Sequence, residues 1–111
     1  DLMKEEKSNF AVELSNELPT KYELSNYPNP FNPATTISYQ LPEQSFVTLK
    51  VFDILGREVA TLVNEHKPAG MYNVTFNARH PGQSREITSG VYIYTLSANG
   101  FVLSKKMLLA K

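Results

Sequence analysis

The fold is decided by a run of strict alternation, Thr35-Thr36-Ile37-Ser38-Tyr39-Gln40-Leu41. Successive side chains of an extended chain point to opposite faces, so the odd-numbered residues share one face and the polar even-numbered residues share the other. The next run repeats the pattern with Val47, Leu49 and Val51. We therefore predict two half-buried strands, and Pro42 ends the first of them.

Turns bracket these two strands. Upstream, a short strand from Tyr22 to Tyr27 stops at Pro28-Asn29-Pro30-Phe31-Asn32-Pro33. Prolines fix φ and lack a backbone N–H, so this segment predicts a rigid turn or crossover. Downstream, Asp53-Ile54-Leu55-Gly56 predicts a type I turn whose glycine takes a positive φ.

Further strands follow that turn. Residues 57–64 place Val59, Thr61 and Val63 on one side, with Ala60 and Leu62 on the other. The same alternation predicts strands over residues 72–77 and 91–97, with the longest loop between them.

The last strand, Phe101 to Ala110, follows Asn99-Gly100. That dipeptide is typical of a two-residue hairpin turn, because both residues tolerate positive φ. The alternation of this strand is imperfect, since Lys105 has the parity of its apolar residues. Either Lys105 extends past the apolar surface at a sheet edge, or a bulge resets the register.

Seven strands at spacings of about ten residues, with no amphipathic helix between them, predict an all-β fold. We expect a seven-stranded antiparallel Ig-like β-sandwich. It would be of the fibronectin-like kind, because the chain has neither cysteine nor tryptophan. This domain would occupy residues 21–111. Residues 1–20 would form a linker or upstream remnant, or add one extra edge strand.

The charge balance argues against two classes of binding partner. Eleven basic and eleven acidic residues give a formal net charge of zero. Nucleic acids and anionic membrane surfaces select a basic excess, so neither is an expected partner. The apolar runs are far shorter than the roughly 20 residues of a membrane helix, so no membrane span is expected.

Residues with catalytic chemistry are sparse. The two histidines, His66 and His80, fall in a turn and in the long loop, where neither has an evident partner for general base catalysis. The carboxylates are scattered and form no calcium-loop pattern, and cysteine ligands for zinc are absent. We therefore expect no catalytic residue, no metal site and no cofactor, and hence no enzyme.

Six tyrosines open a second interpretation. Tyr92 and Tyr94 share one face of their strand, and an exposed row of coplanar rings would suit a sugar. A carbohydrate-binding module of a secreted hydrolase is therefore one alternative function, and a fibronectin-like accessory or interaction module is another. Buried tyrosines would argue against the first, because strands favour aromatic residues for packing alone.

Five segments, taken together, carry a family resemblance. They are, in chain order, Leu24-Ser25-Asn26-Tyr27-Pro28-Asn29-Pro30-Phe31-Asn32-Pro33-Ala34-Thr35-Thr36-Ile37, Val51-Phe52-Asp53-Ile54-Leu55-Gly56-Arg57-Glu58-Val59, Ala69-Gly70-Met71-Tyr72, Ser89-Gly90-Val91-Tyr92-Ile93-Tyr94 and Lys105-Lys106-Met107-Leu108-Leu109-Ala110-Lys111. In this order, and with these gaps, they resemble the type A C-terminal sorting domain of the type IX (Por) secretion system of Bacteroidetes and their relatives.

The resemblance implies a C-terminal secretion signal that is not itself an enzyme. A signal peptide would take the parent protein to the periplasm of a Gram-negative bacterium, where the outer-membrane secretion machinery would recognise the folded domain. A sortase-like protease at the cell surface would then cleave the domain off, within residues 1–21. The cargo would be left secreted or attached to the cell surface.

The resemblance also assigns a sorting motif. Carried over by position, its residues are Pro28, Asn29, Pro30, Gly56, Gly70, Tyr72, Gly90, Tyr92, Lys105, Lys106 and Lys111. The prolines and glycines have a structural explanation beside the functional one, because they suit turns and special backbone geometry.

The three lysines suggest a docking mechanism. An edge strand offers unpaired backbone groups that a partner can extend, and lysines guard such an edge against wrong pairing. We therefore expect the open edge of the last strand to dock on the secretion machinery. The same edge allows a weak homodimer or a strand swap.

Overall fold

The computed structural model describes residues 18–79 and 87–110, so residues 1–17, 80–86 and 111 lie outside it, His80 and Lys111 among them. The described chain forms seven strands and no helix, which confirms the predicted all-β class. The strands are, in chain order, β1 (Glu23–Tyr27), β2 (Ala34–Leu41), β3 (Ser45–Phe52), β4 (Glu58–Lys67), β5 (Gly70–Asn77), β6 (Gly90–Ala98) and β7 (Phe101–Leu109).

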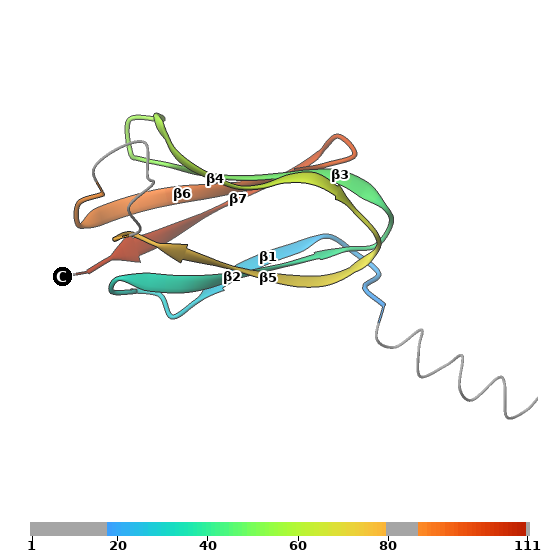
Figure 1. The fold of residues 1–111 in the computed structure, drawn as a ribbon, viewed down its shortest axis with the longest axis horizontal. Coiled ribbons are helices and arrows are strands. Elements are labelled where there is room, and N and C mark those ends of the chain that lie inside the picture. Colours follow the sequence, from blue (N-terminus) through green and yellow to red (C-terminus); the bar gives the residue numbers. More distant parts are fainter. Residues whose placement is uncertain (1–17, 80–86, 111) are drawn as a thin grey trace, which may run out of the picture.

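The strands form two layers, and every pairing is antiparallel. One sheet has the order β1-β2-β5 and the other the order β4-β3-β6-β7. Figure 1 shows the sheets stacked as a sandwich, with β7 running obliquely so that its end lies beside the three-stranded layer. The fourth strand lies next to β3. In antibody constant domains the fourth strand belongs instead to the sheet that contains the first, second and fifth strands. The Ig-like arrangement of this chain is therefore a variant of the constant-domain arrangement.

The core lies between the two sheets and receives side chains from every strand. The alternation seen in the sequence is confirmed in β2 and β3, where Ile37, Leu41, Val47, Leu49 and Val51 are all fully buried. Fully burying such an aliphatic side chain contributes roughly 1.5–3 kcal/mol relative to leaving it exposed. The odd-numbered faces of these two strands therefore supply the centre of the sandwich.

The alternation predicted for β4 is wrong at Thr61. This residue is exposed, while Ala60 and Leu62 are partly buried and pack against the core. The register between β3 and β4 shifts at two places, so Leu49 pairs with Val63 but the next residue, Lys50, pairs with Thr61. A β-bulge inserts one extra residue and reverses the facing of those beyond it, which explains the failure of a simple period of two.

The last strand keeps one register along its whole length. β6 and β7 pair continuously from Gly90 opposite Leu109 to Ala98 opposite Phe101. Of the two explanations for Lys105, the bulge is therefore wrong, and the lysine stands at a core-facing position of an edge strand. The predicted hairpin turn is confirmed, with φ of 51° at Asn99 and 78° at Gly100.

Candidate recognition surface

The edge of β7 is the place where two parts of the expected motif meet. In the four-stranded sheet β7 pairs only with β6, so its other edge faces the three-stranded sheet. The Pro28–Pro33 segment, which joins β1 to β2, lies against the C-terminal half of that edge. The structure thus brings Pro28, Asn29 and Pro30 close to the strand that carries Lys105 and Lys106.

Asn29 bonds to β7 through its side chain in the way a strand bonds through its backbone. Its Oδ1 accepts the N–H of Leu108 at 3.0 Å, and its Nδ2 donates to the carbonyl oxygen of Lys106 at 3.4 Å. One carboxamide offers an acceptor and a donor side by side, as a peptide group does. Asn29 therefore caps two outward-facing backbone groups of β7.

Phe31 continues this pairing with its own backbone. Its N–H donates to the carbonyl oxygen of Leu108, and its carbonyl oxygen accepts the N–H of Ala110, both at 2.9 Å. The ring is 1% exposed and packs edge to face on Phe76, with centroids 6.0 Å apart. The buried ring anchors the loop, and the backbone of Phe31 bonds to the free edge of β7. The C-terminal half of the β7 edge, which we expected from the sequence to be open, is therefore occupied.

A partly buried polar network holds the start of this loop. Thr35 Oγ1 donates to the carbonyl oxygen of Pro28 at 2.8 Å and accepts from Nδ2 of Asn26 at 3.1 Å. The Oδ1 of Asn26 accepts from the hydroxyl of Tyr94 at 2.8 Å, and burial raises the pKa of Tyr94 to about 12. The network joins β1, β2 and β6, so it ties the loop to both sheets.

The two Gly-x-Tyr elements are built alike. The hydroxyl of Tyr72 donates to the carbonyl oxygen of Pro68 at 2.6 Å. In the same way, the hydroxyl of Tyr92 donates to the carbonyl oxygen of Thr88 at 2.5 Å. Each bond reaches four residues back along the chain, as the tyrosine corner of Ig-like domains does. The glycines two residues before these tyrosines have φ of 151° and 144°, a region that disfavours side chains. Both elements therefore shape the entry into a strand.

The turn at Asp53 is held by one carboxylate. Asp53 Oδ1 accepts the N–H of Leu55 at 3.0 Å and of Arg57 at 2.9 Å, while Oδ2 accepts Nε of Arg57 at 2.7 Å. The bond from the Arg57 backbone is the main reason that the pKa of Asp53 is lowered. Gly56 has φ of 83°, which confirms the predicted turn.

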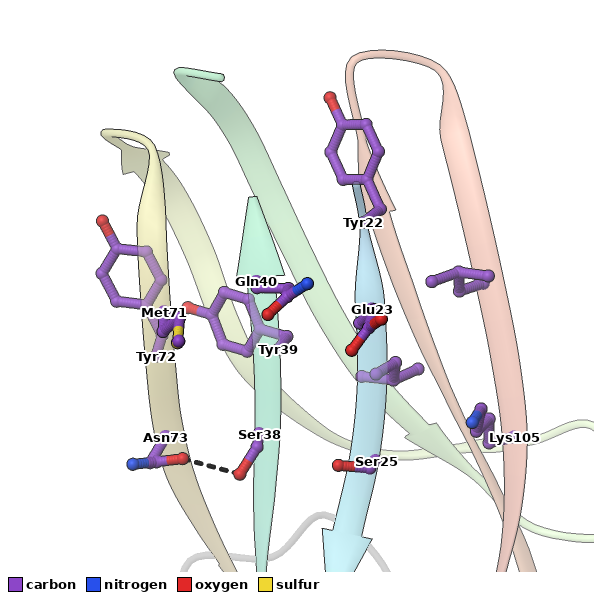
Figure 2. A pocket seen from close by; sticks show the side chains of 12 residues that line it. Tyr22, Glu23, Ser25, Ser38, Tyr39, Gln40, Met71, Tyr72, Asn73 and Lys105 are labelled. Atoms are coloured by element: carbon purple, nitrogen blue, oxygen red, sulfur yellow. Dashed lines mark hydrogen bonds between the residues drawn. The ribbon is translucent and has the colours of Figure 1, made fainter. Parts of the chain in front are cut away.

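Lys105 and Lys106 point to opposite sides of β7, because neighbours in a strand alternate. Both are exposed, and no ion pair involves either within the described part of the chain. Lys105 borders a shallow hollow of about 650 Å³ that crosses the outer face of the three-stranded sheet. Figure 2 shows Lys105 on β7 beside β1, which contributes Glu23 and Ser25 to the same hollow.

The lining of this hollow is engaged in its own contacts. Ser38 donates to Asn73 at 2.6 Å, Gln40 donates to the backbone of Lys21 at 3.2 Å, and Glu23 pairs with Lys21 at 3.2 Å. Within residues 18–79 and 87–110, no three His, Asp or Glu side chains gather as metal ligands would. The described chain also contains no helix with the length and hydropathy needed to cross a bilayer.

Tyr92 and Tyr94 do not form the exposed platform that a sugar would need. Tyr92 and Tyr94 are 5% and 1% exposed, so the face they share is the core face. Tyr39 is also buried and stacks on Tyr72, with ring centroids 5.3 Å apart. The observation that would have favoured a carbohydrate-binding module is therefore not met.

Several residues of this surface were missed from the sequence. Asn26 in β1 and Thr35 in β2 are polar, yet each stands at a position of its strand where the alternation predicts a core-facing side chain. That mismatch was the available signal for a partly buried network. The contact of Asn29 with Leu108 spans 79 residues and gave no local signal.

A comparison of the chain with known protein families finds a match over most of its length. Residues 25–110 match the family model described as the secretion system C-terminal sorting domain. No curated protein matches the chain.

Proposed function

The chain belongs to the family of secretion system C-terminal sorting domains, and we propose that it acts as a folded address label of type IX secretion. Membership identifies a sorting signal, which is not an enzyme family. It implies contact with the secretion machinery and export to the cell surface or beyond. The proposal adds that the machinery reads the sandwich as a folded object and moves the cargo from the periplasm across the outer membrane of a Gram-negative cell.

The observation that supports folded recognition is the way the motif is distributed. The Pro-Asn-Pro element and Lys105 and Lys106 are far apart in the chain, and they meet in the fold because Asn29 and Phe31 bond to β7. A receptor that recognised a linear sequence would meet two separate segments. A receptor that recognised the folded surface would meet one contiguous site.

The later steps follow from the same proposal. A sortase-like protease would cut upstream of the sandwich, within residues 1–21, and release or attach the cargo at the cell surface. Before cleavage, residues 21–111 would form the sorting domain and the preceding residues its linker. A weak homodimer or strand swap of the free domain stays a prediction.

The test is export of a reporter. The 111-residue chain is fused behind an inert periplasmic reporter in a host with a type IX system. The reporter is then measured outside the outer membrane and in the periplasm. We expect it outside; its retention in the periplasm would refute the sorting function.

A pair of variants separates folded from linear recognition. Leu49→Asp places a charge at a fully buried core position and unfolds the sandwich, while every motif residue is kept. Thr48→Asp makes the same change on the outward face of the same strand. We expect Leu49→Asp to stay in the periplasm and Thr48→Asp to be exported. Equal export of both would favour a linear signal.

A further inference from the structure

A short stretch of the β7 edge is left without a backbone partner. The N–H and the carbonyl of Leu108 point away from β6, since they bond to Asn29 and Phe31. In an antiparallel pair the outward-pointing groups belong to alternate residues. The N–H and carbonyl groups of Val102 and Ser104, and the N–H of Lys106, therefore face outward as well, and no described strand pairs with them.

Both ends of this stretch are closed. At one end Asn29 takes the carbonyl oxygen of Lys106. At the other, Tyr22 stacks on Phe101 with ring centroids 4.6 Å apart and an interplanar angle of 17°. β1 lies beside β7 in the other sheet without pairing to it. The open stretch, residues 102–106, is about 17 Å long at ~3.4 Å per residue, which is the length of a short extended segment.

The side chains of this stretch favour a partner of opposite charge. Lys105 faces the seam between the sheets, Lys106 faces the outside of the four-stranded sheet, and neither has an ion pair in the described chain. A charged residue at an inward position is one of the devices by which edge strands resist self-pairing. A second copy of β7 would bring four lysines onto one short ladder, whereas a carboxylate would be attracted.

We propose that residues 102–106 of β7 receive an extended, carboxylate-bearing segment of the secretion machinery, which pairs as a fifth strand of the four-stranded sheet. This inference rests on the proposed sorting function and names the contact through which the address is read. Backbone hydrogen bonds would hold the segment, and its acidic side chain would meet Lys105.

Ser104 offers a matched pair of variants. Ser104→Pro removes one outward N–H and leaves the ladder with β6 intact, because proline is tolerated where the N–H of an edge strand faces solvent. Ser104→Ala keeps that N–H and loses only the 2.9 Å hydrogen bond between the Ser104 and Thr95 hydroxyl groups. In the reporter fusion we expect Ser104→Ala to be exported normally and Ser104→Pro to be exported about tenfold less, as the loss of one hydrogen bond implies.

Charge reversal gives a second test that does not touch the backbone. Lys105→Glu should reduce export, whereas Arg79→Glu, the same change in charge just after β5, should not. Circular dichroism of each purified fusion confirms that it is folded. If Ser104→Pro fails to fold, Lys105→Glu decides alone.

The outcomes separate this inference from the proposed function. Failure of the unmodified fusion to leave the periplasm defeats the sorting function itself. Export of the unmodified fusion together with normal export of folded Ser104→Pro and Lys105→Glu overturns only the edge contact. Sedimentation that finds a stable dimer of the unmodified chain, in place of the weak one expected of the free domain, and a monomer of Ser104→Pro also overturns it, because a second copy then occupies the edge.

Discussion

The side chain of Asn29 pairs with Leu108 across the seam of the sandwich, with Oδ1 3.0 Å from the backbone nitrogen of Leu108. Because the same carboxamide donates to the carbonyl oxygen of Lys106, one side chain substitutes for a short piece of strand. The Pro-Asn-Pro element is therefore more than a turn. It closes the edge of the C-terminal strand and leaves open only the stretch that we assign to a partner.

Replacement of Asn29 should destabilise the end of β7. Asn29→Ala removes both bonds, and because the residue is exposed we expect a loss of about 1 kcal/mol in the free energy of unfolding. Asn32→Ala, in the same loop, is the matched control. Urea unfolding measures the loss, and amide hydrogen exchange should show faster exchange at Leu108. Unchanged protection of that amide would show that the carboxamide does not hold it.

The corner bond of Tyr92 should contribute more than that of Tyr72, because Tyr92 is buried and Tyr72 is only partly so. Tyr92→Phe keeps the ring but deprives Thr88 of its partner for both N–H and carbonyl. We expect it to cost about 1–2 kcal/mol in the free energy of unfolding, and Tyr72→Phe to cost less. Equal losses in urea unfolding would contradict the assignment.

How much of this could be predicted from the sequence depends on the range of each interaction. The strands, the Asp53 turn and the Asn99-Gly100 hairpin follow from alternation and from local turn chemistry, so they were predicted. The bulge in β4 was missed because its register is fixed by β3, which cannot be read from residues 58–67 alone. The role of Asn29 was missed for the same reason, since its partners lie 77 and 79 residues away.

Tyr94 should ionise only at high pH in the folded protein. Burial raises the pKa of Tyr94 to about 12. Burial is also the largest of the causes that act on Tyr39, whose pKa is raised as well. The unfolded chain releases these protons near pH 10, so the stability that Tyr94 contributes is complete below pH 10. It falls as the pH rises from there towards 12. Ultraviolet titration should find a step near pH 12 that Tyr94→Phe removes. A variant that keeps that step would contradict the assignment.

The Asp53 turn should weaken in acid. The N–H of Arg57 is the main cause of the lowered pKa of Asp53, and desolvation opposes it only in part. A depressed carboxyl pKa means that the folded state binds its proton less readily than the unfolded state. The stabilisation is therefore complete above the unfolded value near 3.9 and disappears as the pH falls through the folded value.

Asp53→Asn cannot ionise and keeps no charged bond to Arg57 Nε, although its amide oxygen still accepts the two backbone N–H groups. We expect its melting temperature to lie below that of the parent chain at pH 7 and to approach it as the pH falls below 3.9. Thermal melts from pH 7 to pH 2 measure this, and a difference that stays constant over the range would show that the carboxylate charge does not stabilise the turn.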